Sequence, residues 1–275
     1  MTVIEREVIV DPARRSRRWG SWYVAEHRLM GMRSYYKTLL FTTIGSPFMY
    51  LFALGVGLAT LVNKGSTDAF GGVTYLQFVA PALIASAAVT AAVEECSYPV
   101  LMGFKWNPIF FGMNAAPISG NQIANGFFIA VIGRLLPTTA IYYLVMLVFG
   151  AVPRPLGVLD ILVALLTGLS FGVLIAAFMA TVQNDVGQPA FIQRFIVGPL
   201  LLFSGTFFPL SQMPIYLQWI GWISPLWHGT QLGRTLDYGG IEPGWLTVVH
   251  VLYLVALCIV GWRATQVIIT RRLNK

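Results

Sequence analysis

Residues 159–182 read LDILVALLTGLSFGVLIAAFMATV, and this stretch decides the fold class. Asp160 is its only charged residue, and the apolar run is long enough to cross the roughly 30 Å of hydrocarbon in a bilayer as an α-helix. A helix that is apolar all round has to be surrounded by lipid or by other apolar helices. The stretch therefore predicts a transmembrane helix.

Five other stretches have a similar length and character. The chain of 275 residues is 56% hydrophobic and only 11% charged, whereas soluble domains are about 25% charged. We predict an all-α integral membrane protein with a cytoplasmic N-terminal segment (1–38), a six-helix membrane domain (39–270) and a cytoplasmic tail (271–275). The six expected spans are residues 39–62, 75–97, 121–149, 159–182, 191–210 and 245–270, of which the fifth is the shortest.

Lys and Arg residues indicate the orientation of these spans. Eight of the 18 lie before residue 38. With the N-terminus inside, the inner segments hold 13 basic residues and the outer segments only Lys64, Arg154 and Arg234. Because inner loops are enriched in Lys and Arg, we expect a multi-pass protein of the cytoplasmic membrane with both termini in the cytoplasm. Basic residues beside apolar spans suit anionic lipid headgroups, so we expect no nucleic acid partner.

The segment before the first span has the pattern of an amphipathic helix. Between residues 20 and 37, Trp22, Leu29, Met32 and Tyr36 fall near one face by helical spacing. We expect this helix to lie in the inner membrane interface. The alternative is a cytosolic helix that packs on a partner protein.

Residues 97–120, between the second and third spans, read SYPVLMGFKWNPIFFGMNAAPISG. This inner segment is apolar, aromatic and nearly uncharged, whereas solvated loops are usually polar. Its aromatic side chains have to be buried against something, and an apolar surface of this size predicts a docking site for a cytosolic partner.

Residues 213–227 read MPIYLQWIGWISPLW. The stretch is too short to cross a bilayer and is bracketed by Pro214 and Pro225. It contains three tryptophans, which favour the membrane interface. We predict a re-entrant helical hairpin at the outer face, between spans five and six.

The sequence offers no recognisable constellation of catalytic or metal-binding residues. It lacks a Walker A motif, HExxH and a Cys/His cluster, so we assign no catalytic residue and no metal ligand. Arg134 lies mid-span, and Glu94 and Glu95 lie near the inner end of the second span. Pairing would lower the desolvation cost of these groups. They are either a substrate path or gate or a structural ion pair. By position, Asp160 is expected to reach the interface, and His250 is expected to be a satisfied core residue.

Residues 195–234 carry the most specific pattern, FIVGPLLLFSGTFFPLSQMPIYLQWIGWISPLWHGTQLGR. With the layout of the whole chain, it resembles the permease subunits of type-2 ABC exporters, and most of all the nodulation-factor and daunorubicin-type permeases. The resemblance implies that the 97–117 segment holds a coupling helix that contacts an ATPase. The implied contact residues are Phe104, Lys105, Trp106 and Asn107. The implied residues of the outer hairpin are Phe208, Pro209, Trp219, Trp222, Pro225, Trp227 and His228.

The resemblance also implies partners. They are a dimer of ATPase subunits, which would bind ATP and Mg, and a second permease chain, identical or related, while this chain itself carries no cofactor. The chain departs from the family at Ser119–Gly120–Asn121, where relatives often carry an acidic residue, so a carboxylate role there is doubtful.

The leading functional hypothesis is a permease subunit of an ATP-driven exporter, not itself an enzyme. Its substrate would be amphipathic: a lipid-linked glycan, a glycolipid or a hydrophobic drug. One alternative is a secondary transporter driven by an ion gradient, which would require carboxylates near the midplane. Another is a membrane-embedded enzyme, which would require a nucleophile or metal set that the sequence does not show.

Overall fold

The structure, a computed structural model, describes residues 3–62, 70, 72–240 and 242–275, with side chains from residue 17 onward apart from those at 56, 60 and 61. Every regular element in these ranges is helical, which confirms the all-α prediction. The helices are α1 (Val3–Met32), α2 (Tyr36–Phe52), α3 (Ala59–Val62), α4 (Tyr75–Cys96), α5 (Tyr98–Phe104), α6 (Ile109–Ala115), α7 (Gly120–Val148), α8 (Asp160–Thr181), α9 (Gln188–Phe191), α10 (Gly198–Phe203), α11 (Ile215–Ile223), α12 (Pro225–Tyr238) and α13 (Gly244–Leu273). Short 3₁₀ or π-helical turns lie at Arg33–Tyr35, Ala53–Leu58, Pro155–Leu159, Ile192–Val197 and Leu210–Gln212.

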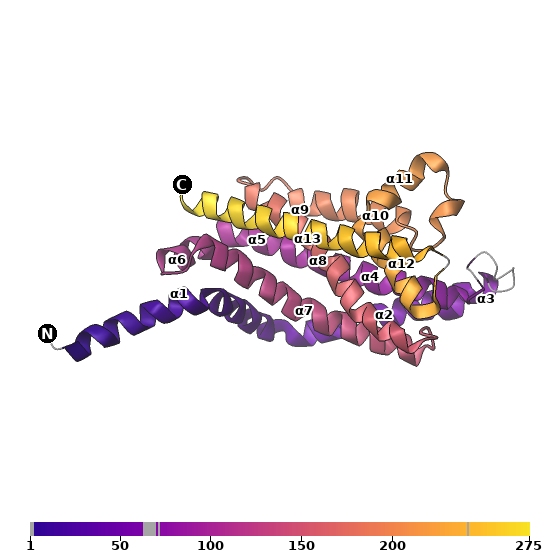
Figure 1. Ribbon diagram of the computed structural model, residues 1–275, viewed down its shortest axis with the longest axis horizontal. Helices are drawn as coiled ribbons and strands as arrows, with labels where there is room; N and C mark the ends of the chain where they lie inside the picture. The colour runs from indigo at the N-terminus through magenta and orange to yellow at the C-terminus, as the bar shows by residue number, and fades with distance from the viewer. Residues whose placement is uncertain (1–2, 63–69, 71, 241) are drawn as a thin grey trace.

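The long helices form an elongated bundle (Figure 1). The N-terminal end of α1, the C-terminus, α5 and α6 lie at one end of this bundle, and α3, α11 and α12 lie at the other (Figure 1). We call the first the terminal end and the second the hairpin end. Lys64, one of the basic residues of the predicted outer segments, lies outside the described residues.

Five helical segments of the described ranges are long and apolar enough to cross a membrane. They are Arg17–Gly55, Tyr75–Phe104, Gly120–Val148, Pro155–Thr181 and Gly244–Leu273. The fifth predicted span corresponds to a shorter apolar helix, Gln188–Phe203. The count of six crossings therefore stays a prediction.

The fifth predicted span ends at Phe203 in the structure rather than at residue 210. The chain turns at Gly205, whose φ of 70° lies in the left-handed region that favours glycine. The Ser204 hydroxyl donates to that of Ser224, with the oxygens 2.6 Å apart. This bond ties the end of α10 to the start of α12, so the apolar residues that follow Ser204 form a turn instead of a further helical turn.

The N-terminal helix packs along α7. Its buried face is formed by Val24, Ala25 and Met32. The backbones come close at Gly126, where any side chain would meet Ser21 and Val24. Of the four residues predicted to fall near one face of this helix, Trp22 is exposed and Met32 is buried. α1 is also joined to the first predicted span through one short 3₁₀ turn.

Helix α4 lies at the centre of the bundle and contacts α2, α7, α8 and α12. Most of its residues are buried, and many of them are alanine. Small side chains let neighbouring helices approach closely, which is how helices associate in membranes. Side chains near the C-terminal end of α4 are thereby held between several helices, and this places the first candidate site.

Candidate functional site

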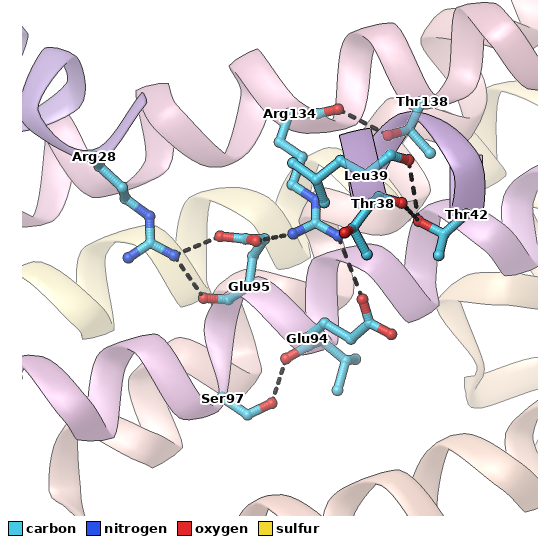
Figure 2. A network of polar contacts seen from close by, with 10 residues as sticks. Arg28, Thr38, Leu39, Thr42, Glu94, Glu95, Ser97, Arg134 and Thr138 are labelled. Atoms are coloured by element: carbon cyan, nitrogen blue, oxygen red, sulfur yellow. Dashed lines mark hydrogen bonds and ion pairs between the residues drawn. The ribbon is translucent and has the colours of Figure 1, made fainter. Parts of the chain in front are cut away.

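Glu95 lies at the centre of a cluster of charged side chains from three helices (Figure 2). It lies near the C-terminal end of α4, and its side chain is only 5% exposed. Arg134 of α7 donates to Glu95 Oε1, so the predicted pairing of these two helices is present. Arg28 of α1 donates from Nη2 to Glu95 Oε2 at 2.5 Å. One buried carboxylate is thus shared by two arginines.

Arg28 is a partner that the sequence pattern did not reveal. Its Nη2 also donates to the Glu95 backbone carbonyl at 3.2 Å. Its guanidinium lies over the ring of Phe127, 4.2 Å from the centroid. Its spacing could reveal it only once the buried face of α1 is known, because Arg28 is four residues from both Val24 and Met32, which are buried. A charge on the buried face of a helix indicates a partner on the helix it packs against.

Glu94 is held more loosely than Glu95. Its side chain is 57% exposed, and its Oε2 lies 3.5 Å from Arg134 Nη2. Glu94 and Arg134 border a cavity of about 240 Å³ between α2, α4, α7 and α10. The other residues that line it are Thr42, Thr43, Ser46, Pro47, Tyr50, Leu83, Ser86, Ala87, Thr90, Ala91, Thr138, Tyr142, Leu201, Thr206 and Phe207.

At the terminal end, the predicted coupling segment forms two short helices, α5 and α6, joined by a turn (Figure 1). Trp106 in this turn is 51% exposed and stacks on Tyr98, with the ring centroids 6.1 Å apart. Asn107 is also exposed. Lys105 is exposed and donates to Asn184 Oδ1 at 3.5 Å. These three residues present a surface at the end of the bundle.

Phe104 differs from its neighbours because its side chain is buried in its own chain. It packs against the rings of Phe110 and Phe111. The Arg272 guanidinium of α13 lies over the Phe104 ring, 4.0 Å from the centroid. In this conformation Phe104 anchors the turn to α6 and α13 rather than presenting a contact surface.

At the hairpin end, α11 and α12 form a helical hairpin that turns at Ser224 and Pro225. Trp219 and Trp222 of α11 are exposed, as is Phe208 just before the hairpin. The second arm is longer than predicted, because α12 continues to Tyr238 and packs on α4, α8 and α13. Pro209 and Trp227 line a second cavity of about 430 Å³ at this end.

A chain of polar contacts joins this hairpin to α13. His228 Nε2 lies 2.9 Å from the Trp222 carbonyl, and His228 Nδ1 lies 2.7 Å from His250 Nδ1. Because the carbonyl can only accept, His228 Nε2 donates and its Nδ1 accepts from His250. Burial lowers the pKa of His228 to about 4, which agrees with a neutral ring. His250 Nε2 lies 2.9 Å from Glu242 Oε2, so His250 is a satisfied core residue, as expected.

Comparison with known proteins identifies the family of this chain. Residues 26–237 match the family model described as ABC-2 type transporter. The chain belongs to the ABC-2 type transporter family. It is 28% identical over 242 residues to Nodulation protein J of Rhizobium leguminosarum bv. viciae, covering 84% of this chain and 86% of the relative. It is 29% identical over 241 residues to Nodulation protein J of Rhizobium meliloti strain 1021, covering 84% and 85%.

The ABC-2 match extends from the last two turns of α1 to the end of α12. It therefore includes Arg28, Glu95 and Arg134, the turn at Trp106 and the whole hairpin, and it ends before α13. This confirms the predicted family resemblance and a multi-pass membrane protein with a transport role. Within the described residues, no group of three or more His, Cys, Asp or Glu side chains gathers as a metal site would require.

Two aspartates of this ABC-2 domain are buried together at the hairpin end. Asp160 at the start of α8 is 1% exposed, so the expectation that it reaches the interface is wrong. The turn Pro155–Leu159 and α12 pack over it. Its carboxyl lies near that of Asp237 on α12, and neither has another hydrogen-bond partner among the described residues. Two buried carboxyls this close are stable together only if they retain a proton.

Replacing Asp237 with asparagine should reduce the pH dependence of stability. Burial raises the pKa of Asp237, so the folded protein binds this proton more tightly than the unfolded chain. The stability that this tighter proton binding contributes is fully present below the usual aspartate pKa of about 3.9. It is lost as the pH rises through the raised pKa of Asp237 in the folded state. The melting temperature of the wild type in detergent should therefore fall between pH 5 and pH 8, and that of Asp237→Asn should fall less. Asp185→Asn, in the loop after α8, is the control, and equal slopes for all three proteins would contradict the prediction.

Proposed function

We propose that this chain is the permease subunit of an ATP-driven exporter in the cytoplasmic membrane. Two such chains, identical or related, would pair, and two ATPase subunits would bind at the terminal end, which would face the cytoplasm. The observation that carries the proposal is the exposed turn at Trp106 in a chain whose residues 26–237 match the ABC-2 family. Exposed tryptophan at the end of a bundle is typical of a contact surface.

The turn is connected directly to the charged cluster, which suggests how ATP would act. α5 follows α4 after the single residue Ser97, and Glu94 and Glu95 lie in the last turn of α4. A displacement of α5 by the ATPase would therefore reach these glutamates and their arginines. ATP would drive the change by binding more tightly to the closed state of the ATPase pair, since a ligand shifts an equilibrium only through such a difference.

The proposed substrate is amphipathic, such as a lipid-linked glycan, a glycolipid or a hydrophobic drug. The cavity beside Arg134 and Glu94 is bordered by both polar and apolar side chains. The Nodulation protein J relatives cover most of the chain and support the permease role, while the choice of substrate rests on the cavity alone. An ion-gradient-driven transporter is the alternative that the experiment below separates from this proposal.

Trp106→Asp should disrupt the coupling to the ATPase. A carboxylate in place of an exposed indole removes its apolar contact area, and loss of a hot-spot side chain from an interface costs about 2 kcal/mol or more. An ATPase with a Walker A motif, sought among the products of the genes beside this one, should co-purify with the wild-type chain and hydrolyse ATP with it in proteoliposomes. With Trp106→Asp, we expect both co-purification and stimulated hydrolysis to fall at least tenfold.

Trp219→Asp is the matched control, because Trp219 is similarly exposed but lies at the hairpin end. It should keep the ATPase bound. Transport that persists without any nucleotide-binding partner would overturn the proposal in favour of an ion gradient.

A further inference from the structure

Arg234 is a buried cation in the wall of the cavity at the hairpin end. This cavity of about 430 Å³ is lined by the turn before α11 and by residues of α4, α11 and α12. Arg234 is only 5% exposed, and Glu242 is the only carboxylate among the described residues that line the cavity. No ion pair joins Arg234 to Glu242 or to any other carboxylate in the described ranges. A buried charge without a partner is costly, so the charges around Arg234 decide what this cavity attracts.

The charge of Glu242 is already balanced by His250. Since His228 Nδ1 accepts from His250 Nδ1 at 2.7 Å, that nitrogen of His250 carries a proton. His250 Nε2 lies 2.9 Å from Glu242 Oε2, and a nitrogen and an oxygen this close share a further proton. Whether this proton belongs to the ring or to the carboxyl, the pair has no net charge. Glu242 therefore leaves the charge of Arg234 unbalanced.

The two buried aspartates supply no more than one negative charge. Asp160 and Asp237 retain a proton between them, and neither lines the cavity. A second cation, Arg154, lies beside Gly239 at the end of α12, where any side chain would meet its guanidinium. The described charges at this end of the bundle therefore have a positive sum, and Arg234 is the cation that borders the cavity.

The Arg234 guanidinium has one hydrogen left for a ligand. It carries five N–H groups in all. Its Nε donates to the Phe78 carbonyl at 3.2 Å. Its Nη2 donates to the carbonyls of Gly205 and Thr206, at 2.8 and 3.5 Å. Its Nη1 donates to Gln231 Oε1 at 3.3 Å, which leaves the second Nη1 hydrogen without a partner among the described residues.

Two further donors border the cavity on the same helix. Trp227 and Tyr238 lie seven residues before and four residues after Arg234, a spacing that places all three on one face of α12. The indole nitrogen of Trp227 is buried without a partner in the described ranges, and an indole N–H can only donate. Burial raises the pKa of Tyr238 to about 12, so its hydroxyl keeps a proton that it can donate. A positive charge surrounded by donors is the complement of an anion with several acceptor oxygens.

We infer that this cavity binds a phosphate group. A phosphate supplies the negative charge that Arg234 lacks, and its oxygens accept from several directions, whereas a carboxylate has only two oxygens. Two sources can deliver this group. One is free phosphate, and the other is the head group of a phospholipid, because the exposed Trp219 and Trp222 of α11 are typical of a helix at the membrane interface. The site does not depend on the proposed export function, since none of its residues belongs to the coupling segment.

Binding to the purified chain in dodecyl maltoside, measured by isothermal titration calorimetry at constant ionic strength, tests the inference. The probes are inorganic phosphate, dihexanoylphosphatidic acid and dihexanoylglycerol, which lacks the phosphate. We expect phosphatidic acid to bind at least tenfold more tightly than dihexanoylglycerol. Phosphatidic acid that also binds tenfold more tightly than inorganic phosphate would support a lipid head group in the site. Equal affinities of these two would support free phosphate.

Gln218→Glu distinguishes this cavity from the other basic surfaces of the chain. Gln218 lines the cavity, and its Nε2 donates to the Met213 carbonyl rather than contacting Arg234. A carboxylate at this position would repel a bound phosphate, so the affinity for phosphatidic acid should fall at least tenfold. Gln212→Glu is the matched control, because it makes the same change of charge at an exposed residue that does not line the cavity.

Tyr238→Phe removes one donor without changing the charge. It should weaken the binding of phosphatidic acid roughly three- to tenfold, the usual effect of losing one hydrogen bond. Arg234 itself is left in place, because its bonds to the turn after α10 hold the hairpin. A melting temperature equal to that of the wild type, measured without phosphate, shows that each variant is folded.

Two results would overturn the inference. One is equal binding of phosphatidic acid and dihexanoylglycerol to the wild type. The other is equal affinity of Gln218→Glu and Gln212→Glu for phosphatidic acid, which would place the bound phosphate on another surface. Arg234 would then be a structural clamp alone.

Discussion

Glu95→Ala is expected to destabilise the protein by about 3–5 kcal/mol, the usual effect of removing one partner from a buried ion pair. The substitution leaves Arg28 and Arg134 without their shared carboxylate, and both arginine side chains are only 17% exposed. The free energy of unfolding, measured by denaturant titration in mixed micelles, checks this expectation. Glu94→Ala is the matched control, because the Glu94 side chain is 57% exposed and its contact with Arg134 is 3.5 Å long.

A further variant separates the two roles that remain open for this cluster. Replacing Arg28, Glu95 and Arg134 together by methionine removes the three most buried charges, leaves the exposed Glu94, and keeps much of the volume. Such apolar replacements of buried ion networks are often neutral or stabilising. If the cluster is structural, the triple variant should recover both stability and transport. If it is a gate, stability should return and transport should not.

Equal stability of Glu95→Ala and Glu94→Ala would contradict the expected result. It would mean that Arg28 and Arg134 find other partners at little cost. The contrast is informative because the two glutamates are adjacent on one helix, the two variants have the same net charge, and both are measured in the same detergent.

The membrane fold could be predicted because it depends on local properties. An apolar run of sufficient length predicts a helix wherever it lies in the chain, and α8 follows residues 159–182 almost residue for residue. The pairing of Arg134 with Glu95 was also predictable, since two neighbouring spans each carried a charge that needed a partner. These inferences required no knowledge of how distant helices pack.

Features that depend on long-range packing could not be predicted in the same way. Asp160 stands at the end of an apolar run, which suggests an interfacial position, but α12 packs over it from 77 residues away in sequence. Arg28 belongs to a helix whose buried face could not be chosen from its pattern alone. The fifth span is shorter than predicted because the Ser204–Ser224 contact and Gly205 end it, and neither changes the hydropathy of the stretch.

The polar residues that line the cavity beside Glu94 and Arg134 are an intermediate case. Each of α2, α4 and α7 contributes a stripe of three polar residues spaced by four, which is visible in the sequence, yet each stripe by itself has a simpler explanation. Serine and threonine are tolerated in membrane helices when they bond to their own backbone, as Ser86 and Thr138 do. Only the structure brings the three stripes to one cavity.

Arg234→Ala should release the hairpin of α11 and α12 from the bundle. Arg234 of α12 is 5% exposed and donates from Nη2 to the Gly205 carbonyl at 2.8 Å and from Nε to the Phe78 carbonyl at 3.2 Å. Its guanidinium also lies over the Phe78 ring, 3.7 Å from the centroid. Truncation would leave buried carbonyls unpaired and remove this packing, for an expected loss of about 3 kcal/mol.

Hydrogen exchange measured by mass spectrometry should locate this loss. Backbone amides in residues 204–223 should exchange faster in Arg234→Ala, while those at the centre of α4 and α8 keep their protection, because the arginine ties the turn after α10 to α12 and α4. Arg234→Lys should restore only part of the protection, since an ammonium group cannot reproduce the planar set of donors. Arg263→Ala is the control, because Arg263 is exposed and donates to Gln266 Oε1 at 3.4 Å. Unchanged exchange in Arg234→Ala would show that the other contacts of the hairpin, among them the Ser204–Ser224 bond and the His228–His250 link, hold it without Arg234.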